Sequence, residues 1–582
     1  MYTQNFTPIT GSLGLSALSA VIPLFVLFVL LGLLKVSARW AALSALIAAI
    51  GIAFWVYEMP AVQIASGTLE GAATGFFPII WIGINAIWLF RLTQLSGHDK
   101  VIRGALARLS PDLRVQTLLI AFCFGALLES LAGGGAPVAI CAVMLIALGI
   151  KPVQAAAICL IADTSPVAFG SLGLPISVLS KVTGLPVHEL GVMVGRQTPI
   201  LALFIPLILI VIADGRRGLK EIWPLALVAG ISFATGQAVG SMYLPIELVD
   251  ISAALLCIGA VVTFLKVWSP ERVRETESSA VLGPAIFVPA KNERFEMLQS
   301  ASTLNSGGGA GIIQGTSSGS RRYSARTLVV ARETIELFRA FAPYAIVIAL
   351  VALSQIKVLK ELLELGTSTL HWPLLDVVTP EGRPLGVVNA KFEWLLSAGS
   401  IVLFAGCLTI PVLGLSAKQA LKVYLKNLGE LKWAIFTVCS VVGVAYVMNL
   451  SGQIVTLGIW AAQTGPAFAF ISPILGWIAT SLTGSDTSAN ALFGVLQITT
   501  AHHTGLSDVL LAAANSSGGV VGKAISPQNL TIAAVAVGIS GKEGVLFRKV
   551  IGWTLLMITI MSVLVLFQST PVLSWMVPSV HS

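Results

Sequence analysis

The chain has 582 residues, of which 56% are hydrophobic and only 11% are charged, and its mean hydropathy is +0.90. A soluble protein of this length needs far more charged surface, so the composition excludes one. The formal net charge of +8 does not indicate a nucleic-acid partner, because the basic residues cluster in short loops beside apolar segments, as the positive-inside rule describes for membrane proteins.

Apolar segments of about 20 residues, the length that crosses a bilayer, recur along the whole chain. Clear cases are residues 15–34, 221–240 and 550–568. A membrane β-barrel would show short alternating segments instead. The pattern therefore predicts an all-α polytopic membrane protein.

The long polar break at residues 269–326 is rich in Gly and Ser, a composition that predicts a flexible cytoplasmic linker. We expect it to separate a first transmembrane repeat, residues 1–268, from a second, residues 327–582. A further polar stretch, residues 357–391, is expected to form an external loop.

The two halves carry matching segments in the same order, which indicates an internal duplication. The segment "FGALLESLAGG" at 124–134 aligns with "LGWIATSLTGS" at 475–485, an offset of 351 positions. The segment "ADTSPVAFGSLGLP" at 162–175 aligns with "ANSSGGVVGKAISP" at 514–527, an offset of 352. Short matches between Gly- and Ala-rich sequences arise by chance, but matches in the same order at nearly equal offsets favour two copies of one unit.

The charged loops then predict how the two copies are oriented. Basic loops placed inside leave the acidic or neutral loops Glu58–Glu70 and Glu247–Asp250 outside. This arrangement works only if residues 115–150 and 466–500 each enter and leave the membrane on one side, from opposite faces. The prediction is about twelve transmembrane helices plus two re-entrant hairpins in two inverted-topology repeats, with both termini external. The alternative left open is that each hairpin is a pair of ordinary short spans.

Four stretches rich in Gly, Ser, Thr and Asn are expected to be non-helical backbone at membrane depth: 131–137, 162–175, 482–490 and 514–529. Such backbone is tolerated only where it is buried in protein or lines a cavity. Free N–H groups at half-helix N-termini and nearby hydroxyl groups can bind a carboxylate. The alternative is close helix packing through small residues. The candidate substrate-binding residues are Gly133, Gly135, Thr164, Ser165, Ser485, Thr487, Ser516, Ser517 and Lys523.

Three acids in or beside these stretches, Glu129, Asp163 and Asp486, are the candidate proton-coupling residues. Acids inside a membrane are expensive and are functional candidates by default, and a carboxyl group in a low-dielectric environment takes up a proton more readily than one in water. Glu129 is the leading proton carrier, and Asp486 is expected to order the second hairpin. A hydrogen-bonded carboxyl that caps a broken helix is the alternative. Lys523 either pairs with a substrate carboxylate or neutralises Asp486.

Other polar residues give weaker indications. Arg196 is a second candidate anion contact, although snorkelling to the interface explains it more simply. His502 and His503 are adjacent, so they point to different faces of a helix, and no hydrolase or zinc motif accompanies them. The six cysteines show no metal-ligand spacing. We therefore expect no enzyme activity, no metal and no cofactor.

Three long segments, 122–140, 482–497 and 513–528, resemble the signature segments of the L-lactate permease family, and the similarity extends through nearly the whole chain. The resemblance implies a secondary active transporter of the bacterial inner (plasma) membrane that imports L-lactate, and D-lactate and glycolate as well, by proton symport. Its partners would then be a small 2-hydroxy monocarboxylate, protons and the lipid bilayer. The chain departs from the family pattern at Gly134, where the family has an aromatic residue, and at Asp163, where it has Asn.

Two rival functions follow from the same residues. A sodium-coupled carboxylate transporter would use the same broken helices, with backbone carbonyls holding the ion, and a passive anion channel would need no coupling acid. The sequence leaves open which 2-hydroxy acid is preferred, how many protons are coupled, whether the moving part slides like an elevator or rocks, and whether the chain forms a homo-oligomer.

Overall fold

The structure is a computed structural model that describes residues 1–30, 34, 36–98, 101, 104, 109–131, 133, 135–270, 318–354, 356–380, 382, 385, 389–539 and 542–578. Helices make up most of the described chain, which confirms the predicted all-α class. Gly134, where the sequence departs from the family pattern, and most of the expected linker, 271–317, lie outside the described residues. Helix α15 begins at Ser318, within the expected linker boundary.

In the N-terminal half the helices are α1 (Leu13–Ala20), α2 (Ile22–Phe28), α3 (Ala38–Trp55), α4 (Ala61–Thr74), α5 (Trp81–Leu95), α7 (Leu113–Thr117), α8 (Gly125–Leu131), α9 (Ala136–Ala147), α10 (Pro152–Ala162), α11 (Gly170–Thr183), α12 (Val187–Tyr243) and α13 (Ile246–Leu265). Two π-helical segments, Gly75–Ile80 and Leu118–Phe124, join α4 to α5 and α7 to α8.

In the C-terminal half the helices are α15 (Ser318–Ser354), α16 (Lys357–Glu364), α17 (Ala398–Val412), α18 (Ala417–Ser451), α19 (Gln453–Ala461), α20 (Phe468–Thr483), α21 (Asp486–Thr504), α22 (Asp508–Gly522), α23 (Pro527–Ala536) and α24 (Glu543–Gln568). Short 3-10 turns lie at Ala462–Ala467, Lys523–Ile525 and Ser574–Met576.

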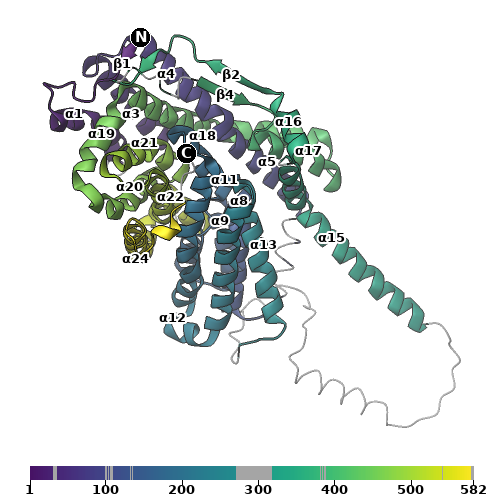
Figure 1. Ribbon diagram of the computed structural model, residues 1–582. Coiled ribbons are helices and arrows are strands. Elements are labelled where there is room, and N and C mark those ends of the chain that lie inside the picture. The colour runs from purple at the N-terminus through teal and green to yellow at the C-terminus, as the bar shows by residue number, and fades with distance from the viewer. Residues whose placement is uncertain are drawn as a thin grey trace, which may run out of the picture.

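Four short strands form two small sheets. Strand β1 (Tyr2–Thr3) pairs in parallel with β3 (Val377–Val378), and β2 (Thr367–His371) pairs antiparallel with β4 (Asn389–Glu393). The polar stretch 357–391, expected as a loop, therefore contains helix α16 and these strands. The pairing of β1 with β3 brings the N-terminus to the same side of the molecule as that stretch (Figure 1).

Within the described residues, seven helical runs are long and apolar enough to cross a membrane by length and composition. The chain is thus a multi-pass membrane protein. The seven runs are Ala61–Leu95, Leu113–Leu131, Val187–Tyr243, Ile246–Leu265, Ala417–Ser451, Gln453–Thr483 and Glu543–Gln568.

Helix α12, 57 residues long, folds back on itself at Gly215, whose φ of +66° and ψ of −157° are outside the helical region. Its two arms pack against each other, since Thr198 on the first arm donates a hydrogen bond to Gln237 on the second at 3.0 Å. A Cβ atom at Gly195 would collide with Ser241. Small residues at this contact let the two backbones approach closely.

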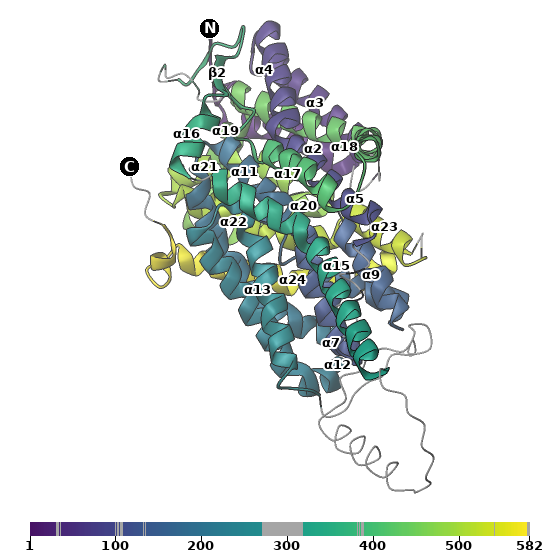
Figure 2. The ribbon, with the colours of Figure 1, turned by 90° about the vertical axis from the view of Figure 1, so that its right-hand side faces the viewer.

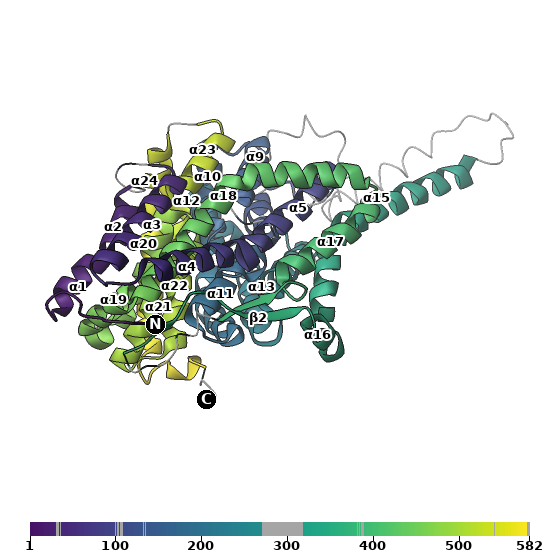
Figure 3. The same ribbon diagram turned by 90° about the horizontal axis from the view of Figure 1, so that it is seen from above.

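The two halves of the chain interleave in space. Helices α3 and α4 pack against α18, and α11 and α12 pack against α21 and α22 (Figures 2 and 3). Helix α15 projects from the helical body (Figure 1). The molecule is therefore built from contacts between halves, and one of them positions the polar cluster described below.

Four local predictions from the sequence were wrong. The stretch 482–490 was expected to be non-helical, but it is helical except at Gly484 and Ser485, because α20 continues to Thr483 and α21 begins at Asp486. Glu70 lies in helix α4 and Asp250 in helix α13, each with 1% of its surface exposed, so neither belongs to an external loop. The stretch 514–529 is mostly helical rather than broken, because α22 continues to Gly522 before a 3-10 turn. The small residues of α22 serve close packing there, since a Cβ at Gly518 would collide with the backbone of Pro473 on α20.

Candidate functional site

Lys523 is buried between two carboxyl groups from the other half of the chain. Its Nζ lies 2.5 Å from Glu129 Oε1 and 3.0 Å from Asp163 Oδ2. The exposed fractions are 4% for Lys523, 3% for Glu129 and 6% for Asp163. The three candidate residues are thus brought together as one buried ion cluster, which we call the Lys523 triad. The sequence did not predict this pairing of Lys523.

Each member of the triad stands where a helix ends. Glu129 lies on α8 two residues before that helix ends, Asp163 directly follows α10, and Lys523 directly follows α22. Gly170 leaves room for the Glu129 side chain, because a Cβ there would lie 3.0 Å from Oε1. The broken helices therefore aim three charged side chains at one point.

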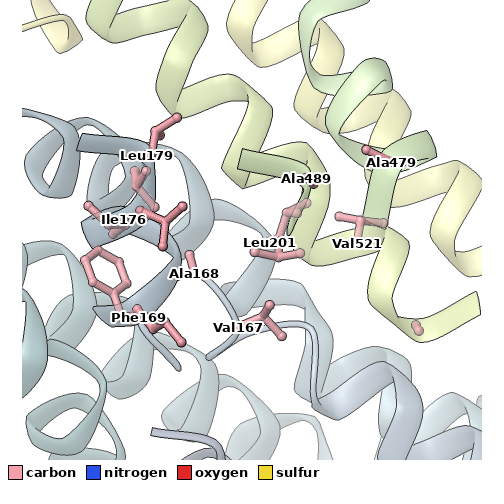
Figure 4. Close-up of a cluster of buried hydrophobic side chains, with 14 of the residues drawn as sticks. Val167, Ala168, Phe169, Ile176, Leu179, Leu201, Ala479, Ala489 and Val521 are labelled. Atoms are coloured by element: carbon pink, nitrogen blue, oxygen red, sulfur yellow. The ribbon is translucent and has the colours of Figure 1, made fainter. Parts of the chain in front are cut away.

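The chain between α10 and α11 is non-helical and is held by apolar side chains. Val167, Ala168 and Phe169 are buried, and Figure 4 shows them in one cluster that also includes Ala489 and Val521 from the C-terminal half. These apolar residues come from both halves of the chain. Their packing holds the polar residues 163–165 in place, although these residues are not part of a regular helix.

Asp486 forms a second polar centre at the break between α20 and α21. Its Oδ2 accepts hydrogen bonds from Ser516 Oγ at 2.6 Å and from Asn490 Nδ2 at 3.4 Å. Ser485 caps α21 by accepting from the backbone N–H of Ser488 at 3.3 Å. Gly484 has φ of +76°, a conformation that glycine adopts without strain. Asp486 thus links α21 to α22 through Ser516.

A chain of buried amides that the sequence reasoning missed extends from Asp486. Asn515 Nδ2 donates to Asn490 Oδ1 at 2.9 Å, Gln497 Nε2 donates to Asn515 Oδ1 at 3.2 Å, and Ser472 Oγ donates to Gln497 Oε1 at 2.8 Å. The signal was present in the sequence, because Asn490 and Gln497 follow Asp486 at spacings of four and eleven residues, which share one face of a helix.

Several buried polar atoms around the two centres have no hydrogen-bond partner within the described part of the chain. The atoms are Glu129 Oε2, Asp163 Oδ1, Ser165 Oγ, Thr480 Oγ1, Asp486 Oδ1, Ser517 Oγ and Asn529 Oδ1. Buried polar atoms are normally paired. The hydroxyl groups in this set can donate to a carboxylate, and the carboxyl and amide oxygens can accept from a hydroxyl group.

Four further candidate residues lie outside the Lys523 triad. Thr164 Oγ1 donates to the backbone of Ile161 at 2.7 Å, and Thr487 is half-buried in the first turn of α21. Gly133 and Gly135 have φ of +57° and +81° at the start of α9. Gly133, Gly135 and Thr164 lie outside regular helix, whereas Thr487 lies inside α21.

The polar residues set aside by the sequence analysis lie apart from the triad. Arg196 donates to the backbone carbonyl of Met576 at 2.7 Å. His502 is 64% exposed at its side chain and contacts Asp508 at 2.6 Å. Neither contact involves a residue of the Lys523 triad.

Comparison with known proteins finds one family and several similar proteins. A family profile described as L-lactate permease matches residues 16–572. An L-lactate permease of Bacillus subtilis (strain 168) is 40% identical, over 99% of this chain and 100% of that protein. The glycolate permease GlcA of Escherichia coli (strain K12) is 40% identical, over 98% of each chain.

Two solved structures are more distantly similar. The YdaH transporter of Alcanivorax borkumensis has 16% identity and a TM-score of 0.39, over 86% of this chain and 87% of that one. MtrF of Neisseria gonorrhoeae has 12% identity and a TM-score of 0.41, over 87% of this chain and 84% of that one. The family match covers nearly the whole sequence, and the chain belongs to the L-lactate permease family.

Proposed function

We propose that this protein is a secondary active transporter that imports L-lactate, and D-lactate and glycolate as well, by proton symport. The relatives at 40% identity are permeases for L-lactate and glycolate, which supports the substrate class. The observation that carries the coupling is the Lys523 triad, in which one buried ammonium is shared by two carboxyl groups.

The charge of the triad gives a reason for coupling substrate to protons. With all three groups ionised, it carries one excess negative charge in a buried environment, which is unfavourable unless further partners balance it. A proton on Glu129 neutralises that excess and weakens its hold on Lys523. The ammonium then becomes available to the substrate carboxylate, while Asp163 keeps Nζ in position.

The surrounding hydroxyl groups complete the proposed binding site. Ser165 Oγ and Ser517 Oγ are buried without a partner among the described residues and are the donors we assign to the substrate carboxylate. Backbone N–H groups near Gly133 and Gly135, at the start of α9, add to this anion site. We propose the same role for Thr164, Ser485, Thr487 and Ser516.

The architecture we propose is two inverted-topology repeats, residues 1–268 and 327–582, joined by the linker at 269–326. Two observations support it. The aligned residues Gly133 and Gly484 both have positive φ, and each follows the end of a helix, α8 or α20. About twelve crossings and two hairpins are part of this proposal, as are external termini in a bacterial inner membrane.

The test is lactate uptake by the purified full chain in proteoliposomes under imposed ion gradients. We expect uphill accumulation driven by a pH gradient without sodium, and competition by glycolate stronger than by pyruvate. Accumulation that follows a sodium gradient and ignores pH would favour sodium coupling. Equilibration without accumulation under any gradient would favour a passive channel.

A further inference from the structure

A further buried carboxyl, outside the Lys523 triad and the Asp486 centre, is linked to the proposed substrate site through one intermediate side chain. Asp250 Oδ1 on α13 accepts a hydrogen bond from Gln237 Nε2 at 2.9 Å. The same Nε2 donates to the backbone carbonyl of Ser165 at 3.2 Å. Gln237 is fully buried, and Asp250 is 1% exposed. The chain Asp250–Gln237–Ser165 thus ends two residues after Asp163.

Asp250 has no basic partner in any ion pair found among the described residues, and its Oδ2 has no hydrogen-bond partner. A buried carboxyl group with so few hydrogen bonds lowers the stability of the fold by several kcal/mol. Such a group is therefore a candidate for a functional role. Helix packing alone does not need it, since α13 could be apolar at this position. The carboxyl group contacts Gln237.

The geometry around Gln237 shows what Asp250 contributes. Gln237 Oε1 accepts from Thr198 Oγ1 at 3.0 Å, so both ends of the amide are used. An acceptor at Asp250 forces Nε2 toward α13 and toward the Ser165 carbonyl, and leaves Oε1 for Thr198. Without that acceptor the amide can rotate, and the Ser165 carbonyl loses its only side-chain donor found in the described chain.

We propose that Asp250 is a positioning residue for substrate recognition, which acts through Gln237 to hold the non-helical segment 163–169 in its binding conformation. The segment carries Asp163 of the triad and the unpartnered hydroxyl of Ser165. The link to substrate rests on the proposed function, whereas the hold on the segment does not.

Two measurements on the full-length protein test the proposal. The first is hydrogen–deuterium exchange of the backbone in peptides that cover 160–170, on purified protein in detergent. The second is the KM and maximal rate of lactate uptake in proteoliposomes. The variants are Asp250→Leu, which removes the acceptor, Asp250→Asn, which keeps an acceptor oxygen, and Gln237→Leu. Ser252→Ala on the same helix is the matched control, because its hydroxyl bonds only the backbone of Val249.

We expect Asp250→Leu and Gln237→Leu to exchange about tenfold faster in this segment and to raise KM by about tenfold, the size expected for the loss of one hydrogen bond to a charged group. Asp250→Asn should restore both values to within about twofold of wild type, since an amide oxygen can accept the same bond. Maximal rate should change little.

Unchanged exchange in Asp250→Leu would overturn the proposal, and so would equal defects in Asp250→Leu and Asp250→Asn. Faster exchange across the whole protein in Asp250→Leu would also overturn it, because that result indicates general destabilisation. If the wild-type protein moves no lactate while the exchange results hold, the proposed function fails and the positioning role of Asp250 stands.

Discussion

Glu129 and Lys523 are 394 residues apart in the sequence, and their side chains meet at 2.5 Å in the folded chain. The contact joins α8 in the first half to the end of α22 in the second. Because Asp163 shares the same ammonium, any change in the charge of one carboxyl changes how firmly Lys523 is held. The predictions below follow from this coupling and from the neighbouring Asp486 centre.

Glu129→Gln should abolish uphill lactate accumulation but keep exchange of labelled lactate across the membrane. The amide cannot take up a proton at neutral pH, whereas exchange needs no net proton movement. The measurement is net uptake and counterflow in proteoliposomes. Glu361→Gln, on the exposed face of α16, is the matched control. A Glu129→Gln protein that still concentrates lactate would remove Glu129 from the coupling mechanism.

Lys523→Met should destabilise the protein by about 3–5 kcal/mol, the cost of removing one partner from a buried ion pair. Glu129 and Asp163 would then lie side by side without a counter-charge. The triple variant that adds Glu129→Gln and Asp163→Asn should recover most of the loss, since no buried charge remains in the triad. Thermal unfolding of the purified protein measures both effects. Equal stability of Lys523→Met and wild type would show that the triad is not formed.

Ser516→Ala and Ser517→Ala should behave differently although the two serines are adjacent. Ser516 donates to Asp486 at 2.6 Å, so its loss should cost about 1.5–3 kcal/mol of stability. Ser517 Oγ has no hydrogen-bond partner in the part of the chain that the structure describes. Ser517→Ala should therefore leave stability unchanged and raise KM for lactate by about tenfold, the value of one hydrogen bond to a charged group. A loss of stability in Ser517→Ala together with a raised KM alone in Ser516→Ala would contradict the proposed site.

Gly519→Ala should reduce stability even though alanine favours a helix over glycine by about 1 kcal/mol. A Cβ at this position of α22 would collide with Asp486 Oδ1 and would lie 2.8 Å from Thr480 Oγ1. Gly544→Ala in α24 is the control, because a Cβ there meets nothing within 4 Å. The unfolding temperatures of the two variants measure this effect. A higher unfolding temperature in Gly519→Ala would contradict the close packing of α22 against Asp486.

The sequence by itself determined the class of protein and identified the candidate site residues. Long apolar segments are stable only in contact with lipid or with each other, so they identify a membrane protein. Few charged residues lie within or beside these segments. The acids and the single lysine in the four polar stretches were therefore clear candidates. Positions of helix breaks at Gly133 and Gly484 also followed from composition, because consecutive small residues and Pro disfavour helix continuation.

Only the tertiary structure decided which of those residues meet. From the sequence, Lys523 was expected to pair with a substrate or with Asp486, and in the folded chain its ammonium group contacts Glu129 and Asp163. Helix α22 was expected to be broken at Ser516 and is continuous there, and Asp250 was expected in a loop and is buried against Gln237. The physical reason is that local sequence fixes where a helix can end, whereas the partner of a buried charge is set by how distant helices pack.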